Sequence, residues 1–283
     1  CVGGTDTDTG VDTDTGVDTD TGVDTDTGNG DTGGEWGQDP PPPVTGGTAG
    51  WTTRYWDCCK AHCGWTGNTV NQGTSGTLQS CDASDTALWS YDAASACGGG
   101  NAHTCFSLAP WAVGSRFAYG FVAMPYEYGM CGRCYQIDFT GPSSSSGNDP
   151  GSFALAGKTM IVQVINTGGD VSSHQMDLMI PGGGVGAFDA CSSQWSLSTS
   201  ALGERYGGLL ATCRNQNPGA ALSVIKSCVL SKCEAIFSGS FKAELMEGCR
   251  WFVNWFEAAN NPAVNYKQVT CPSAITSRSG MSH

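Results

Sequence analysis

The pattern of hydrophobic and polar positions predicts short strands separated by glycine-rich turns. Three runs rich in apolar and β-branched residues have strand character: residues 117–124, 134–139 and 158–165. Weaker helical patterns lie near residues 220–231 and 241–256, and the serine-rich run at 143–147 is typical of a loop. The order of elements favours a β-rich barrel with helical excursions over alternating strand–helix units.

The first 50 residues have a different pattern from the rest of the chain. A six-residue repeat fills residues 5–28, once as TDTDTG and three times as VDTDTG. Alternating Asp resembles the start of a calcium-binding loop, but Thr occupies the third ligand position and no Glu closes the loop. A disordered, self-repelling linker is the favoured interpretation. Four prolines at 40–43 extend it as a stiff spacer, so we expect residues 1–50 to be a linker and 51–283 the folded domain.

The charge of the chain is concentrated in this linker. The formal net charge is -13, and residues 1–50 hold 11 of the 26 acidic side chains and no Lys or Arg. The remaining 15 acidic and 13 basic groups give the body a net charge of only -2. A near-neutral body lacks the basic surface of a nucleic-acid-binding protein. No apolar run approaches the roughly 18–20 residues of a membrane-spanning helix. We therefore expect neither a nucleic acid nor a membrane as a partner.

Fourteen of the 15 cysteines lie between Cys58 and Cys271, and this even number suggests a disulfide framework formed outside the cytoplasm. Zinc is the alternative, because Cys131 and Cys134 form a C-x-x-C, but the paired knuckles of a zinc ribbon are missing. The chain begins with Cys1 rather than Met. We therefore expect a fragment or mature form whose secretion signal lies outside this sequence.

One segment, residues 52–65, gathers the groups that a catalytic site needs. Its candidate residues are the carboxylate Asp57, the aromatics Tyr55, Trp56 and Trp65, and the cations Arg54 and Lys60. Cysteine crosslinks would fix the backbone beside Asp57, and flat aromatic faces are suited to stacking sugar rings. The alternative is a structural strand with a solvated Asp.

A second segment, residues 166–188, places Asp170 and Asp177 between glycine turns, where side chains reach a cleft. If residues 174–177 are extended, Gln175 and Asp177 share one face and His174 points the other way. Ordinary turn chemistry is the alternative interpretation.

The motif TTRYWDCCKxxCxW resembles the signature of family 45 glycoside hydrolases, which are small secreted endoglucanases. Similar matches continue through NTGGD, IPGGGVGAFDAC, ERYGG, CRWFVNWF, NNP and QVTCP, over nearly all of residues 51–271. The resemblance implies a mainly β fold, a disulfide-rich six-stranded double-psi β-barrel with helical and long-loop insertions. It also implies that residues 51–283 form a catalytic domain that hydrolyses internal β-1,4-glucosidic bonds with inversion.

The resemblance also implies roles for individual residues. Asp57 falls on the general base, Asp177 on the general acid and Asp170 on an auxiliary carboxylate. Tyr55 falls on the cleavage subsite and Trp65 on a sugar-stacking aromatic; Trp56, Arg54 and Lys60 are further substrate-binding candidates. The implied disulfides are Cys58–Cys191, Cys59–Cys97 and Cys63–Cys131.

The sequence departs from the family pattern at three places. Gln175 and Met176 precede Asp177 where the family has His and Phe, which changes the surroundings of the acid. Gly132 and Met281 occupy the two ends of an implied disulfide, so that bridge is absent. The stretch 213–249 is longer than expected and adds two cysteines.

The expected partner is a β-1,4-glucan polysaccharide, and a carbohydrate-binding module upstream of Cys1 is a further expectation. We expect a secreted monomer with no cofactor and no metal. The alternative is a non-hydrolytic expansin-like or barwin-like protein that loosens or binds cell-wall carbohydrate. Such chains lack the carboxylate of the first motif, so the presence of Asp57 favours the enzyme. The sequence leaves the preferred glucan open.

Overall fold

The computed structural model describes residues 39–145 and 147–283, so the repeat at 5–28 lies outside the described residues. The strands are β1 (Thr48–Tyr55), β2 (Ser80–Cys81), β3 (His103–Thr104), β4 (Trp111–Ala112), β5 (Phe117–Met124), β6 (Cys134–Ser143), β7 (Thr159–Thr167), β8 (Gln175–Met179) and β9 (Pro262–Val269). The α-helices are α1 (Pro150–Ala154), α2 (Cys191–Trp195), α3 (Gly208–Gln216), α4 (Leu222–Ile236), α5 (Ala243–Asn254) and α6 (Ser273–Ser279). Short 3-10 turns, such as η1 (His62–Gly64), connect several of them.

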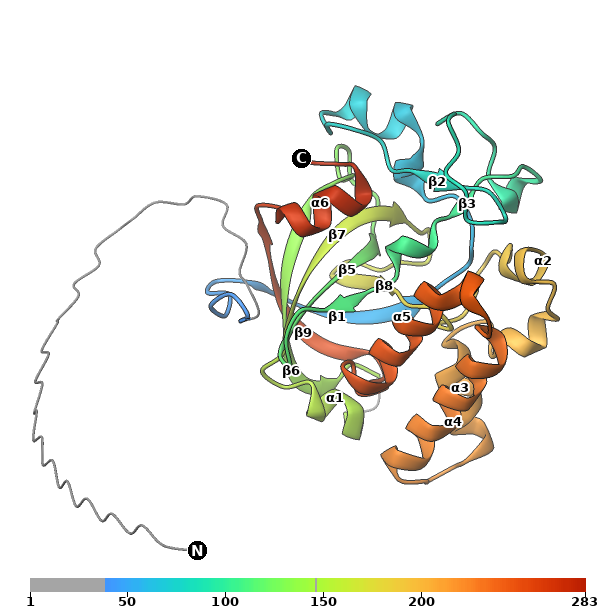
Figure 1. Cartoon of the computed structure of the whole chain (residues 1–283). Helices are drawn as coiled ribbons and strands as arrows, with labels where there is room; N and C mark the ends of the chain where they lie inside the picture. The colour runs from blue at the N-terminus through green and yellow to red at the C-terminus, as the bar shows by residue number, and fades with distance from the viewer. Residues whose placement is uncertain (1–38, 146) are drawn as a thin grey trace, which may run out of the picture. The chain divides into compact units, whose positions relative to one another are not determined.

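Seven strands form one sheet in the order β4-β5-β7-β6-β9-β1-β8, and a further pairing of β5 with β8 closes six of them into a ring. The pairs β1–β8 and β5–β7 are parallel, and the remaining pairs are antiparallel. The helices lie around the outside of this ring (Figure 1). The mainly β architecture expected from the sequence is confirmed.

The most continuous apolar runs of the sequence form strands that are buried on both faces. The run 117–124 is β5, and seven of its eight residues are buried. Its residues Ala118, Phe121 and Val122 join the main core, whereas Phe117 shares a second cluster with Ile275 of α6. No helix among the described residues is long and apolar enough to cross a membrane.

The folded body begins before residue 51, where the sequence placed its boundary. β1 starts at Thr48. The backbone N–H of Val44 donates to Asp138 at 2.7 Å, and Gln136 donates to the carbonyl of Pro42 at 2.8 Å. An extended proline-rich segment keeps its carbonyls free, so it can dock as an acceptor beside a strand. Residues 42–50 are therefore part of the body.

All 14 cysteines of the described residues are paired in seven disulfides, so the zinc alternative is wrong. Three are the implied bridges Cys58–Cys191, Cys59–Cys97 and Cys63–Cys131. The other four are Cys81–Cys105, Cys134–Cys271, Cys213–Cys228 and Cys233–Cys249. The last two link α3 to α4 and α4 to α5, which accounts for the long stretch 213–249 as a crosslinked helical cluster (Figure 1).

Gly132 and Met281 occupy the positions at which the family resemblance implies a disulfide, and here the Gln163 side chain connects them instead. The Gln163 amide donates to the carbonyl of Gly132 at 3.0 Å and to that of Met281 at 3.1 Å. Gly132 has a φ of +81° and little room for a Cβ, which would lie 2.9 Å from Thr74. A glycine suits this position for both reasons.

Candidate active site

A groove crosses the end of the ring where β1, β7 and β8 carry the candidate residues. It consists of two hollows of about 730 and 440 Å³. The two hollows adjoin, because both are lined by Tyr55, Asp170, Asp177, Gly186 and Tyr206. Asp57 lines the larger hollow and Arg54 the smaller one. The sequence-predicted carboxylates are therefore brought together on one open surface.

Asp57 follows the last residue of β1 by two positions and is fixed by its neighbours. Its carbonyl accepts from Ala190 N–H at 2.9 Å, and its carboxylate accepts from Cys59 N–H at 2.9 Å. Cys58 has a φ of +62° and is bonded to Cys191, which holds this unfavourable turn in place. Burial, with a smaller contribution from the charge of Asp177, raises the pKa of Asp57 to about 7.

Asp177 lies in β8, opposite Thr53 of β1 in the parallel register. Its carboxylate accepts from the Thr53 hydroxyl at 2.7 Å. Burial and the charge of Asp170 raise the pKa of Asp177 to about 7, although the Thr53 hydrogen bond and the Arg54 cation oppose the rise. Two carboxyl groups with raised pKa values thus share the groove.

Tyr55 and Asp170 complete the centre of the groove. The Tyr55 hydroxyl accepts from the Asn166 amide at 3.1 Å, and burial raises its pKa well above the usual range, so it stays a neutral donor. Asp170 follows the Gly168–Gly169 turn and lines both hollows. It lies close enough to Asp177 for its charge to raise the pKa of that carboxyl group.

Arg54 and Lys60 reach the groove lining, but their cations are already engaged. Arg54 is buried and donates to the carbonyl of Gly207 and to the amides of Asn260 and Asn261. Lys60 donates to the carbonyls of Tyr91 and Ala93 at 2.6 and 2.8 Å. Both side chains hold neighbouring loops in place, and their role in substrate binding stays a prediction.

Neither predicted tryptophan is among the residues that line the two hollows. Trp56 is 2% exposed and belongs to the hydrophobic core, so its assignment to substrate binding is wrong. Successive residues of an extended chain point to opposite faces, and Tyr55 takes the groove face. Trp65 is half-buried, lies outside the residues that line the groove, and carries the Lys60 ammonium over its ring at 3.3 Å. The Lys60 ammonium thus occupies one face of the Trp65 ring, and sugar stacking by Trp65 stays a prediction.

The exposed aromatics of the groove are Phe188 and Tyr206, which sequence reasoning did not single out. They are 61% and 63% exposed, and both line the larger hollow. Each lies in a motif shared with the family, AFDAC and ERYGG, which was the available signal. Thr53 was also missed, because only the pairing of β1 with β8 places its hydroxyl on Asp177.

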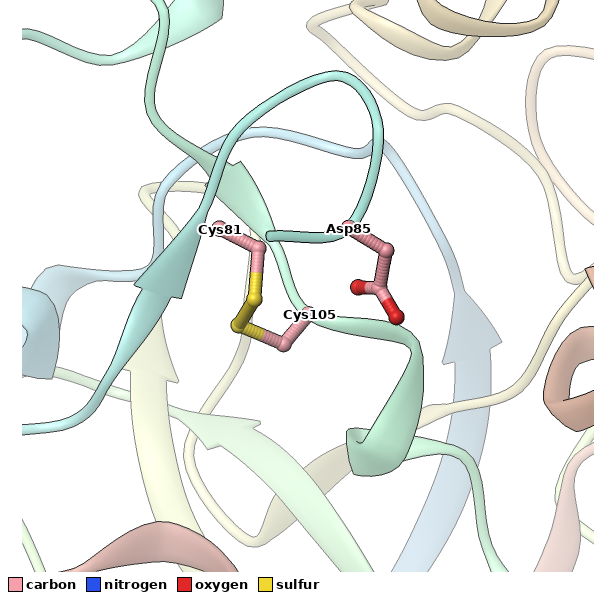
Figure 2. Close-up of side chains that lie close together, drawn as sticks. All are labelled: Cys81, Asp85 and Cys105. Atoms are coloured by element: carbon pink, nitrogen blue, oxygen red, sulfur yellow. A yellow bond between two sulfur atoms is a disulfide. The ribbon is translucent and has the colours of Figure 1, made fainter. Parts of the chain in front are cut away.

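One group of potential metal ligands occurs among the described residues, and it lies elsewhere. Cys81, Asp85 and Cys105 have ligand atoms within 4.8 Å of one another. Figure 2 shows that the two sulfurs are bonded to each other, so neither is a free thiolate. The Asp85 carboxylate accepts from Phe106 N–H at 2.8 Å. This cluster therefore functions as a loop crosslink.

Residues 49–282 match the model of glycosyl hydrolase family 45. Endoglucanase B of Cellvibrio japonicus is 51% identical over 241 residues, which cover 85% of this chain and 47% of that protein. An endoglucanase of Cryptopygus antarcticus is 34% identical over 82% of this chain and 88% of its own length. The crystal structure of a cellulase from the same springtail superposes with a TM-score of 0.66, at 33% identity, over 85% of this chain and 99% of that one.

The chain spans about half the length of some of these relatives, including the Cellvibrio protein and a putative endoglucanase type K of Fusarium oxysporum, of which it covers 53%. The shared region contains every residue of the groove described above.

Proposed function

Because this chain belongs to glycosyl hydrolase family 45, we propose that it is an endo-β-1,4-glucanase that cleaves internal bonds of cellulose or a related β-glucan with inversion. The observation that carries the proposal is the pair of carboxyl groups, Asp57 and Asp177, on one groove with pKa values raised to about 7. Glycoside hydrolysis needs one protonated and one ionised carboxyl group across the bond.

Electrostatic repulsion favours this single-proton state near neutral pH. Ionising Asp177 raises the pKa of Asp57, so the two groups resist carrying charge together. The backbone N–H on Asp57 favours its ionised form, and the negative Asp170 favours protonated Asp177 against the Thr53 hydrogen bond and the Arg54 cation. The match of Asp57 and Asp177 to the family motifs supports the same assignment. We therefore assign Asp57 as the general base and Asp177 as the general acid.

Inversion requires a water molecule between the base and the anomeric carbon. The two carboxylates accept from different donors, Cys59 N–H and Thr53 Oγ1. Asp57 lies just after β1, whereas Asp177 lies in β8. The hollow of about 730 Å³ that they share provides room for sugar and water. Phe188 and Tyr206 offer exposed rings on which a glucan chain can stack.

The remaining parts of the proposal concern the whole protein. The closed ring of six strands is proposed to be a double-psi β-barrel. Seven disulfides support a secreted protein, since such bridges persist in oxidising compartments. A carbohydrate-binding module upstream of Cys1 and a monomeric state belong to the same proposal.

The test is hydrolysis of carboxymethylcellulose, followed by viscosity and by released reducing ends. An endo-acting enzyme lowers viscosity early, and Asp57→Asn should abolish both signals. Glu247→Gln, at an exposed position of α5, is the matched control and should behave like wild type. Loss of wall stiffness without new reducing ends would instead indicate the expansin-like alternative and would contradict hydrolysis.

A further inference from the structure

A chain of three hydrogen bonds leads from the backbone to the proposed acid. Ser172 N–H donates to the Gln175 side-chain oxygen at 2.9 Å. The Gln175 amide nitrogen lies 2.9 Å from the Thr53 hydroxyl, which lies 2.7 Å from Asp177 Oδ1. Gln175 and Asp177 are two residues apart on β8, so both side chains reach the same face. Thr53 lies opposite Asp177 on β1, and its hydroxyl contacts both side chains.

The direction of every bond in this chain is fixed. A backbone N–H can only donate, so the carboxamide oxygen must face Ser172 and its NH₂ must face Thr53. Thr53 therefore accepts from Gln175, and its single proton is left for Asp177. If Asp177 carried its own proton on Oδ1, two donors would meet and the Thr53 proton would lose its acceptor.

We propose that Gln175 is a positioning residue for the acid. Through Thr53, it confines the transferable proton of Asp177 to Oδ2, so that the proton is presented in one place for the leaving-group oxygen. The inference rests on the proposed hydrolysis and deepens it. The position before Met176 and Asp177 is one where this chain departs from the family, and an amide keeps one hydrogen-bonding pattern at every pH at which the enzyme would work.

Several charged or titratable groups surround Asp177 and bear on any pH effect. Asp170 and Arg54 act on its ionisation in opposite directions, and Asp57 and Tyr55 are electrostatically coupled to it. None of them is changed by substitutions at Gln175 or Thr53. Effects of those substitutions on the acid can therefore be separated from effects of its charged neighbours.

The test compares Gln175→Met, Thr53→Val and the double variant on two substrates. One is a cello-oligosaccharide, and the other is an aryl cello-oligosaccharide whose nitrophenolate leaves without a proton. For Gln175→Met, kcat on the natural linkage should fall about tenfold with KM unchanged, a fraction of the 10²–10⁴ that general acid catalysis contributes. The aryl substrate should show no loss. Thr53→Val breaks the same hydrogen-bond chain, so it should lower kcat on the natural linkage as well. The double variant should then have the same kcat as Thr53→Val alone.

The proton itself can be followed without turnover. In a ¹³C NMR titration of the carboxyl groups, Thr53→Val should raise the pKa of Asp177 by about one unit, because a hydrogen bond to the charged form is lost. Thr53→Ser should restore it, and Thr140→Val, which loses an exposed hydroxyl on β6, is the control.

Equal losses on both substrates, additive effects in the double variant, or an unchanged Asp177 pKa in Thr53→Val would each overturn the proposal. Failure of the wild type to cleave either substrate would instead reject the proposed function, and the titration would still decide whether the hydrogen-bond chain acts on Asp177.

Discussion

At the residue scale, the proposed reaction depends on two carboxyl groups that perform opposite tasks. Asp57→Asn and Asp177→Asn should each lower kcat/KM on a cello-oligosaccharide at least about 100-fold, the lower end for general acid–base catalysis. The acid variant should recover on a substrate with a good leaving group, whereas the base variant should not. Recovery of Asp57→Asn rather than Asp177→Asn would reverse the two assignments.

The same two residues should make stability depend on pH. Both pKa values rise from 3.8 to about 7 on folding, so the folded chain holds more protons than the unfolded chain between these values. The free energy of unfolding should therefore fall as pH rises from about 4 to about 7. The double variant Asp57→Asn/Asp177→Asn lacks both carboxyl groups, so this pH-dependent fall in the free energy of unfolding should disappear. It should be more stable than wild type at about pH 8 and differ little from it at about pH 3. Urea unfolding at the two pH values measures it, and an equal difference at both would contradict the raised pKa values.

The three candidate carboxylates chosen from the sequence all lie on the groove, whereas Tyr55 alone of the three candidate aromatics lines the two hollows. Asp57, Asp170 and Asp177 all line the groove, because the motifs that contain them are specific. Trp56 does not, because adjacency in sequence says nothing about which face a side chain takes until the strand is known. Once Tyr55 occupies the groove face, its neighbour must enter the core.

At the scale of elements, individual strands were predictable and their pairing was not. The run 117–124 coincides with β5, because a strand buried on both faces has a nearly continuous apolar pattern. The parallel register of β1 with β8, which brings Thr53 to Asp177, joins residues 124 positions apart. No local pattern specifies such a pairing, so the hydrogen-bond chain to Asp177 appeared only in the structure.

Removing two different disulfides, one at a time, should distinguish a bridge that positions Asp57 from a bridge that only stabilises the fold. Removing Cys58–Cys191 should lower stability by roughly 2–5 kcal/mol and should also lower kcat, because the turn beside Asp57 is released. Removing Cys213–Cys228 should lower stability in the same range but leave kcat within about twofold, since residues 213–249 do not line the groove as described. Alanine pairs at each bridge, assayed below their unfolding temperatures, provide the comparison. Equal effects on kcat would show that the first bridge does not position Asp57.

At the scale of the whole molecule, the described body includes part of the expected linker. Removing residues 1–38 should leave kcat/KM on a cello-oligosaccharide within about twofold, because every residue that lines the groove follows Thr53 or is Thr53 itself. Removing residues 1–47 should in addition lower stability by about 1–3 kcal/mol, since Asp138 and Gln136 lose the partners Val44 and Pro42. A tenfold loss of activity in the shorter truncation would show that residues 1–38 contribute to the site.

The most direct measurement of the central claim is the anomeric form of the first product. If Asp57 activates water while Asp177 protonates the leaving oxygen, a single displacement converts a β-linked glucan to the α-anomer. Proton NMR of a cello-oligosaccharide during the first minutes of hydrolysis, before mutarotation, should show the α-anomer appearing first. An initial β-anomer would mean a double displacement through a covalent intermediate, and would contradict the roles given to Asp57 and Asp177.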